Sequence, residues 1–259
     1  MDLGIRGRKA IVCAGSKGLG RGCAMALAQA GVDIVLNARG ADTLAATANE
    51  IMAATGVTVT PVAADITTPE GRAAVLGEAG EVDILVTNAG GPPPGNWRDW
   101  SRDDFIAALD ANMLAPIAMM QAVLPAMIEQ RWGRVVNITS QSVRAPIAQL
   151  GLSNSARSGL TGFVAGTSRQ VAEYGVNINN LLPGLHATDR AVSLDTAAAK
   201  AKGISVEEAK AQREASIPVR RYGTPEEFGA TCAFMCSVHA GFMVGQNVML
   251  DGGLNNISI

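Results

Sequence analysis

Seven short runs of aliphatic and β-branched residues alternate with longer segments of helical composition, and this alternation constrains the fold more than any other feature. Each run is about five residues long and ends in Gly, Asn, Asp or Ser, as strands commonly do. Nearly continuous apolar strands are typical of a parallel sheet that is covered by helices on both faces. We therefore predict an α/β fold with a single Rossmann-type, doubly wound sheet of about seven parallel strands.

The chain shows no linker, internal repeat or low-complexity tract, so we expect one domain over residues 1–259. The predicted strands lie at 9–15, 32–38, 57–64, 82–90, 133–140, 176–184 and 246–253. The predicted helices lie at 19–30, 41–55, 69–80, 103–130, 154–174 and 225–237.

Two segments interrupt the alternation. Residues 90–100 form a loop rich in Pro and Gly, whose Trp97 and Trp100 either line a binding site or anchor the loop. Residues 185–218 follow a strand and contain a polar, Ala-rich helical stretch. An insertion of this length at the carboxyl end of a strand is typical of a lid, so we predict that 185–218 covers the substrate.

Composition excludes several classes of function. The net charge is −2, which gives no attraction to nucleic acid or anionic lipid, and no run of 18 apolar residues marks a membrane span. We expect a cytoplasmic protein without nucleic-acid or membrane partners. The pair Cys232 and Cys236 resembles half of a metal site, but no second pair completes it, so we predict buried thiols and no metal; Cys13 and Cys23 are expected to be small core residues.

A glycine-rich turn joins the first predicted strand to the first predicted helix. Glycine at such a turn lets the backbone approach a pyrophosphate and directs the helix N-terminus at its charge. A glycine cluster alone is weak evidence, but its place between a strand and a helix strengthens the prediction of a dinucleotide site. The turn consists of Gly15, Ser16, Lys17, Gly18, Leu19 and Gly20.

The second predicted strand ends at Arg39, 19 residues after Gly20, where this fold meets the adenosine ribose. An acidic residue at this place would bind the 2′-hydroxyl of NAD. Arg39 and Lys17 instead provide two cations that can neutralise the 2′-phosphate of NADP. We predict NADP as the cofactor; the alternative is that both are solvated surface cations.

Taken together, the motifs resemble those of the classical short-chain dehydrogenase/reductase family over essentially the whole chain. The resemblance implies an adenine contact at Asp65 and Ile66, catalytic roles for Asn112 and Ser140, and nicotinamide binding by the loop after the sixth strand. Individually, each motif also has a purely structural interpretation: a plain turn at Asn88-Ala89-Gly90, a strand terminator at Pro183-Gly184, an N-cap at Asp65 for the helix after Pro69, and an ordinary helix residue at Asn112. The matching motifs are the glycine turn, Ala64-Asp65-Ile66, Asn88-Ala89-Gly90, Asn112, Ser140, Pro183-Gly184 with Thr188, and Asp251-Gly252-Gly253.

The chain departs from the family pattern at two places. The family's glycine turn is T-G-x-x-x-G-x-G, but Cys13 and Ala14 occupy its first two positions, and the first glycine follows one residue later. The family's Tyr-x-x-x-Lys pair is the second departure. Alignment on the Leu-x-Gly-Phe at 160–163 places Ser153 at the Tyr position and Arg157 at the Lys position.

These replacements leave the proton donor undefined. Ser140 can still donate a hydrogen bond to a developing alkoxide, and Arg157 can bind the nicotinamide ribose but cannot shuttle protons. Ser153 is a poor general acid because its hydroxyl is far less acidic than a phenol. His186 follows the nicotinamide loop and is either a proton donor or a solvated loop histidine. Arg144 either holds an anionic substrate or is a surface cation.

We therefore expect an NADP-dependent oxidoreductase that interconverts a small-molecule carbonyl and a secondary alcohol, most similar to the 3-oxoacyl-carrier-protein reductase branch. Two alternatives remain open: a non-redox lyase, dehydratase or isomerase on the same fold, and a non-catalytic NADP-binding protein. The resemblance also implies a homotetramer, built by the long helices after strands four and five and by the C-terminal strand.

Overall fold

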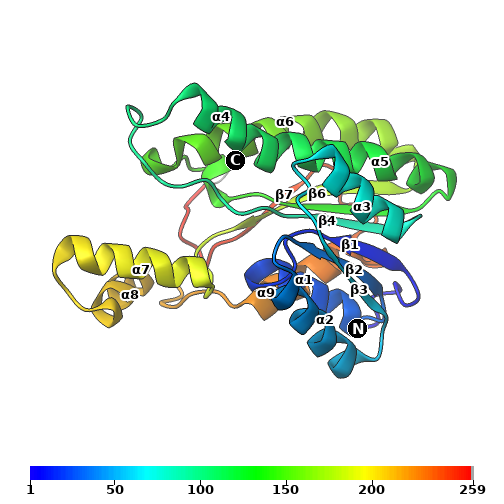
Figure 1. Ribbon diagram of the computed structural model, residues 1–259, viewed down its shortest axis with the longest axis horizontal. Helices are drawn as coiled ribbons and strands as arrows, with labels where there is room; N and C mark the ends of the chain where they lie inside the picture. The colour runs from blue at the N-terminus through cyan, green and yellow to red at the C-terminus, as the bar shows by residue number, and fades with distance from the viewer. Residues whose placement is uncertain (258–259) are drawn as a thin grey trace.

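The computed structural model describes residues 1–257 and contains one sheet of seven parallel strands, in the order β3-β2-β1-β4-β5-β6-β7 (Figure 1). This arrangement confirms the predicted Rossmann-type fold. Because the order reverses between β1 and β4, the carboxyl ends of these strands open a crevice, which is where such sheets bind ligands. The strands are β1 (Lys9–Val12), β2 (Asp33–Ala38), β3 (Val59–Ala63), β4 (Ile84–Thr87), β5 (Gly133–Ile138), β6 (Val176–Pro183) and β7 (Asn247–Leu250).

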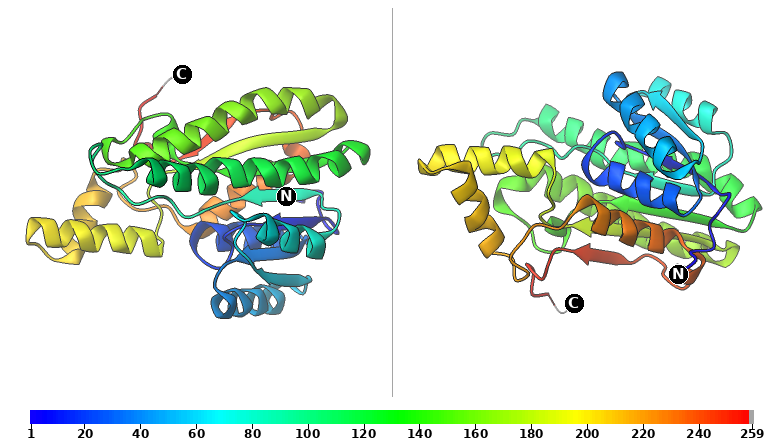
Figure 2. Two further views of the ribbon diagram at one scale, coloured as in Figure 1. Left: turned by 45° about the horizontal axis from the view of Figure 1, so that its top comes forward. Right: turned by 90° about the horizontal axis from the view of Figure 1, so that it is seen from below.

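Helices cover both faces of the sheet (Figures 1 and 2). On one face lie α1 (Gly18–Gln29), α2 (Ala41–Thr55) and α9 (Pro225–Cys236), which form one apolar cluster with the strands. On the other face lie α3 (Pro69–Ala79), α5 (Ala115–Glu129) and α6 (Gly151–Val171), which form a second cluster. Every residue of β5 is buried, as expected for a strand that is covered on both sides.

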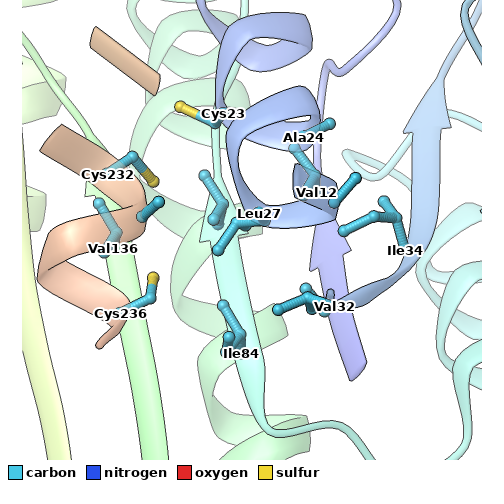
Figure 3. Packing of buried hydrophobic residues seen from close by; sticks show 14 of the residues in the cluster. Val12, Cys23, Ala24, Leu27, Val32, Ile34, Ile84, Val136, Cys232 and Cys236 are labelled. Atoms are coloured by element: carbon cyan, nitrogen blue, oxygen red, sulfur yellow. The ribbon is translucent and has the colours of Figure 1, made fainter. Parts of the chain in front are cut away.

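Small residues allow α1 and α9 to pack closely. A Cβ atom at Gly22 would overlap the carbonyl oxygen of Pro225, and one at Gly229 would overlap that of Gly22. Cys23, Cys232 and Cys236 lie in the same cluster (Figure 3). All four cysteines are buried thiols, and no group of metal-ligating side chains occurs in residues 1–257.

The predicted helix at 103–130 is interrupted. It consists of α4 (Arg102–Leu109), a π-helical turn (Asp110–Leu114) and α5. By length and composition this stretch could cross a membrane, but 44% of its most apolar window is buried within the molecule, a pattern that core helices share. Thr68 is the N-cap of α3, and its side chain accepts a hydrogen bond from Gly71 N, so the alternative role of Asp65 as that N-cap is wrong.

The segment predicted as a lid forms two helices rather than one helical stretch. These are α7 (Asp189–Lys202) and α8 (Val206–Ala215), which project beyond the carboxyl edge of the sheet (Figure 1, yellow). Gly203, with a φ of 68°, ends α7 in the left-handed conformation that favours glycine. The hairpin has its own buried polar centre, where Tyr222 donates to Asp195 at 2.8 Å and Arg213 lies 3.3 Å from the same carboxylate.

The Pro/Gly loop is anchored by one tryptophan. Trp100 packs edge-on against Phe105, with 6.4 Å between ring centroids, and a Cβ at Gly151 would overlap its ring. Trp97 is 71% exposed and carries Arg98 over its ring. Trp100 therefore anchors the loop to the start of α6.

Candidate functional site

The glycine turn forms a cradle at the carboxyl end of β1. Gly18 has a φ of 52°, in the left-handed region that favours glycine, and a Cβ at Gly20 would overlap the carbonyl oxygen of Ala14, so the turn has no room for a side chain at position 20. α1 begins at Gly18, and no side chain of residues 1–257 caps its N-terminus. Its first amide groups therefore remain available to an anion. These features fit the pyrophosphate of a dinucleotide.

The first departure from the family pattern has a visible conformational cost. Ala14 has a φ of 48°, in the left-handed region, and it stands where the family carries glycine. Gly15, one residue later, donates its N–H to the carbonyl of Asn37 at 2.9 Å, and a Cβ there would overlap Leu36. Ala14 thus takes a conformation that glycine adopts more readily, and Gly15 is held against β2 by this hydrogen bond.

The two predicted 2′-phosphate ligands lie in different surroundings. Arg39 is exposed after β2 and lies near Asp65, whose pKa is lowered first by hydrogen bonds from Thr67 and to a smaller extent by the Arg39 charge. Lys17 Nζ instead lies 3.5 Å from Asp189 Oδ2 at the start of α7, with both side chains largely exposed. Arg39 therefore lies at the carboxyl end of β2 near Asp65, whereas Lys17 would have to leave Asp189 to join it.

The segment after β4 lies beside the glycine turn. The Asn88 Nδ2 atom lies 3.1 Å from a Cβ built on Gly20. The carbonyl oxygen of Ala89 accepts a hydrogen bond from Arg157 Nη2 at 3.3 Å. Asn88, Ala89 and Gly90 thus join the cradle to the next strand end.

Ser140 lies two residues after the end of β5 and is half-buried. It caps a short 3₁₀ helix, Gln141–Val143, and its Oγ accepts from Ser142 N at 3.1 Å and from Ser142 Oγ at 2.9 Å. A hydroxyl has two acceptor lone pairs and one donor proton. With both lone pairs occupied, the Ser140 proton is the group left to interact with a ligand.

Asn112 lies in the π-helical turn and is 3% exposed. Its Nδ2 donates to the carbonyl of Ala108 at 3.2 Å, whereas its Oδ1 has no partner within residues 1–257. The side chain lines a pocket of about 150 Å³ together with Gly90 and Leu152. A buried acceptor without a partner is costly, so this oxygen fits a donor that enters with water or a ligand.

Arg157 joins two strand ends. Its Nη1 donates to the carbonyls of Ile138 at 2.8 Å and Thr139 at 2.6 Å, in addition to the Nη2 bond to Ala89. Burial, and then the charge of Arg190, lowers the pKa of Arg157 to about 10, so the guanidinium remains a cation at neutral pH. These three hydrogen bonds use much of the donor capacity of the Arg157 side chain for the protein backbone. Ser153, one helical turn earlier, is 5% exposed.

His186 is buried rather than solvated, which corrects the alternative of an exposed loop histidine. Its ring packs edge-on against Phe228, with 5.2 Å between centroids, and against the backbone of Gly223. Burial lowers its pKa, which favours the neutral ring. His186 lines a surface pocket of about 210 Å³ together with Arg221 and Glu227. This pocket is separate from the one that Asn112 lines.

The loop after β6 packs on residues 140–143, the 3₁₀ turn that Ser140 caps and that is called the Ser140 turn below. A Cβ at Gly184, next to Pro183, would lie 2.6 Å from Asp251 Cα and 3.1 Å from Gln141 Oε1. Thr188 precedes α7, and its Cγ2 lies 3.3 Å from a Cβ built on Gly18, so this loop reaches the glycine turn.

Three further residues, Gln141, Arg190 and Asn255, were not found from the sequence. Asn255 Nδ2 donates to Gln141 Oε1 at 2.9 Å and links the C-terminal turn to the Ser140 turn. Arg190 of α7 donates from its Nη1 to the carbonyl of Gly91 at 3.1 Å, and its charge contributes to the lowered pKa of Arg157. Of these three residues, Gln141 carried a signal in the sequence, because it directly follows Ser140.

Arg144, which the sequence left as either a ligand for an anionic substrate or a surface cation, is exposed.

Comparisons with known proteins agree with this geometry. The family model described as enoyl-(acyl carrier protein) reductase matches residues 13–255. Acetoacetyl-CoA reductase of Cupriavidus necator is 34% identical over 183 residues, covering 70% of this chain and 69% of its own. A 3-oxoacyl-acyl-carrier-protein reductase of Aquifex aeolicus is 29% identical, covering 98% of this chain and 100% of its own.

A solved structure supports the same assignment. L-sorbose reductase from Gluconobacter frateurii, in complex with NADPH and L-sorbose, superposes with a TM-score of 0.94 at 27% identity, covering 99% of this chain and 100% of its own. The glycine cradle, the Ser140 turn and the parallel sheet thus occur together in a chain that matches this family over nearly its full length. The chain belongs to the short-chain dehydrogenase/reductase family of oxidoreductases, on its 3-oxoacyl reductase-like branch.

Proposed function

We propose that this protein is an NADP-dependent oxidoreductase that interconverts a carbonyl and a secondary alcohol with a non-standard proton donor. The observation that carries the proposal is the half-buried Ser140 hydroxyl, whose lone pairs are occupied by Ser142, on the same sheet edge as the open N-terminus of α1. The anion cradle follows β1 and the donor proton follows β5, on the same edge of the sheet with β4 between them. A bound dinucleotide and a carbonyl require both groups. Relatives described as NADPH-dependent or bound to NADPH support the cofactor.

The chain's own residues would hold the dinucleotide along this edge. Residues 15–20 would bind the pyrophosphate, Arg39 the 2′-phosphate, and Asp65 with Ile66 the adenine. Asn88, Ala89 and Gly90 would line the crevice, and Pro183, Gly184, Thr188 and Arg157 would hold the nicotinamide half. When bound, NADPH supplies the hydride.

The remaining chemistry is stabilisation of negative charge on the carbonyl oxygen. Ser140 donates a hydrogen bond to that oxygen, and the Arg157 cation adds a positive field from beneath the strand ends. Asn112, with its unpartnered Oδ1, is suited to hold a water molecule near the site. We assign proton delivery to water, with Ser153 as a weaker candidate; the packing of His186 on Phe228 makes it less suitable as the acid.

A turnover assay separates this function from its rivals. The protein is mixed with NADPH and a panel of ketones and β-ketoesters, nicotinamide absorbance is followed, and products are identified. Oxidation of NADPH with formation of an alcohol supports the proposal. Conversion of a substrate without oxidation would support the non-redox alternative, and binding of NADPH with no conversion would support a non-catalytic role.

We also propose that the protein is a cytoplasmic homotetramer. A Cβ added at Gly162 or Gly166 of α6 meets no atom within 4 Å in the described chain, so this helix face is open to another copy. Light scattering at micromolar concentration tests the assembly, and a monomeric mass would refute it.

A further inference from the structure

Ser142 is a buried hydroxyl that the mechanism above uses only as a neighbour of Ser140. Its side chain is completely buried in the 3₁₀ turn after β5. Within residues 1–257, the hydrogen-bond partner of its Oγ is Ser140 Oγ, at 2.9 Å. Its backbone N–H points at the same oxygen, at 3.1 Å.

The burial of Ser142 decides which hydroxyl donates. If Ser140 donated to Ser142, the Ser142 proton would be left without a partner inside the protein, and an unsatisfied buried donor is unfavourable. If Ser142 donates to Ser140, its own proton is satisfied and the Ser140 proton is left on the half-buried side. The second arrangement is therefore favoured, since only the Ser140 hydroxyl can find a partner outside the turn.

This arrangement also strengthens Ser140 as a donor. A hydroxyl that accepts hydrogen bonds is polarised and donates more strongly. The two bonds from Ser142 also fix the direction of the Ser140 Oγ, which otherwise rotates about χ1. In a site where serine stands at the position of the family's tyrosine, this polarised hydroxyl is the main side-chain donor left for the carbonyl oxygen.

We propose that Ser142 is a positioning residue that commits the Ser140 hydroxyl to donate its proton to the substrate oxygen. The assignment rests on the proposed function, because it needs a developing negative charge at that oxygen. The hydrogen bond from Ser140 to the substrate oxygen is stronger in the transition state than in the ground state, because negative charge develops on that oxygen. Loss of the Ser142 hydroxyl should therefore lower kcat and leave KM nearly unchanged.

A double-mutant cycle tests the proposal, with steady-state kinetics on a ketone that the assay above identifies. Ser142→Ala should lower kcat about five- to tenfold, the scale of one hydrogen bond, with unchanged NADPH affinity by calorimetry. In a Ser140→Ala background the same change should lower kcat less than about twofold, because the group it positions is gone. Ser142→Cys keeps the size of the side chain with a weak donor and should give an intermediate rate.

Ser155→Ala is the matched control, because its hydroxyl donates to the carbonyl of Gly151 at 2.9 Å on α6, away from Ser140. Its kcat should equal that of the unchanged protein. The assignment is overturned if Ser142→Ala keeps full kcat while Ser140→Ala loses it, or if the two effects multiply fully, as two independent structural defects would. An unchanged kcat in Ser140→Ala would overturn the proposed function as well.

Discussion

Replacing Arg157 by methionine should destabilise the protein, because this guanidinium holds the ends of β4 and β5 together. Its Nη1 bonds to Ile138 and Thr139 are 2.8 and 2.6 Å long, and the Nη2 bond to Ala89 is a longer 3.3 Å. The side chain is 7% exposed, so water cannot readily replace it at these carbonyls.

The magnitude follows from the two short bonds. Hydrogen bonds from a charged donor contribute about 1.5–3 kcal/mol each, which gives a gross loss of about 3–6 kcal/mol. Burial of the cation without a carboxylate costs several kcal/mol, and this cost disappears with the charge. We therefore expect the free energy of unfolding to fall by about 2–3 kcal/mol.

Urea denaturation followed by circular dichroism measures this change. Arg169→Met is the matched control, since Arg169 lies near the end of the same helix and is exposed, with a 3.3 Å bond to the Ala165 carbonyl. That variant should stay within about 0.5 kcal/mol of the unchanged protein. Equal stabilities for Arg157→Met and the unchanged protein would refute the view that Arg157 joins the strand ends.

Three further changes test other parts of the account. Ala14→Gly should raise the free energy of unfolding by about 1 kcal/mol, because Ala14 has a φ of 48°; a decrease in urea denaturation would contradict this. NADPH should bind at least about tenfold more tightly than NADH, and Arg39→Asp should reverse that preference in calorimetry; equal affinities in the unchanged protein would argue against Arg39 as the 2′-phosphate ligand. Ser153→Tyr combined with Arg157→Lys should raise the turnover of simple ketones, since it supplies a phenol beside the carbonyl; a fall in turnover in a folded variant would argue against ordinary site geometry.

Local patterns in the sequence were sufficient for the fold. Continuous apolar strands predicted the parallel sheet, and the glycine turn predicted the passage from β1 to α1, because both depend on residues that are near one another in the chain. The break in the lid helix could also have been predicted, because Gly203 is a typical helix-ending residue. The π-helical turn at Asp110–Leu114 was not predicted from the sequence.

Contacts between distant segments account for what the sequence missed. The burial of His186 depends on Phe228 from α9, and the use of Arg157 as a strand clamp depends on the carbonyl of Ala89. Lys17 was expected to act together with Arg39, but its ion-pair partner is Asp189 at the start of α7. None of these pairs is adjacent in sequence, and each forms only after the sheet and its helices are assembled.

The most direct measurement of the central claim is the turnover of Ser140→Ala compared with Ser153→Ala. Ser140→Ala should lose about a hundredfold or more in turnover, because the change removes the hydrogen bond to the developing oxyanion. Ser153→Ala should lose at most about tenfold, because that hydroxyl is a poor acid. An intact activity in Ser140→Ala, with or without a large loss in Ser153→Ala, would contradict the account, and the non-redox function would replace it.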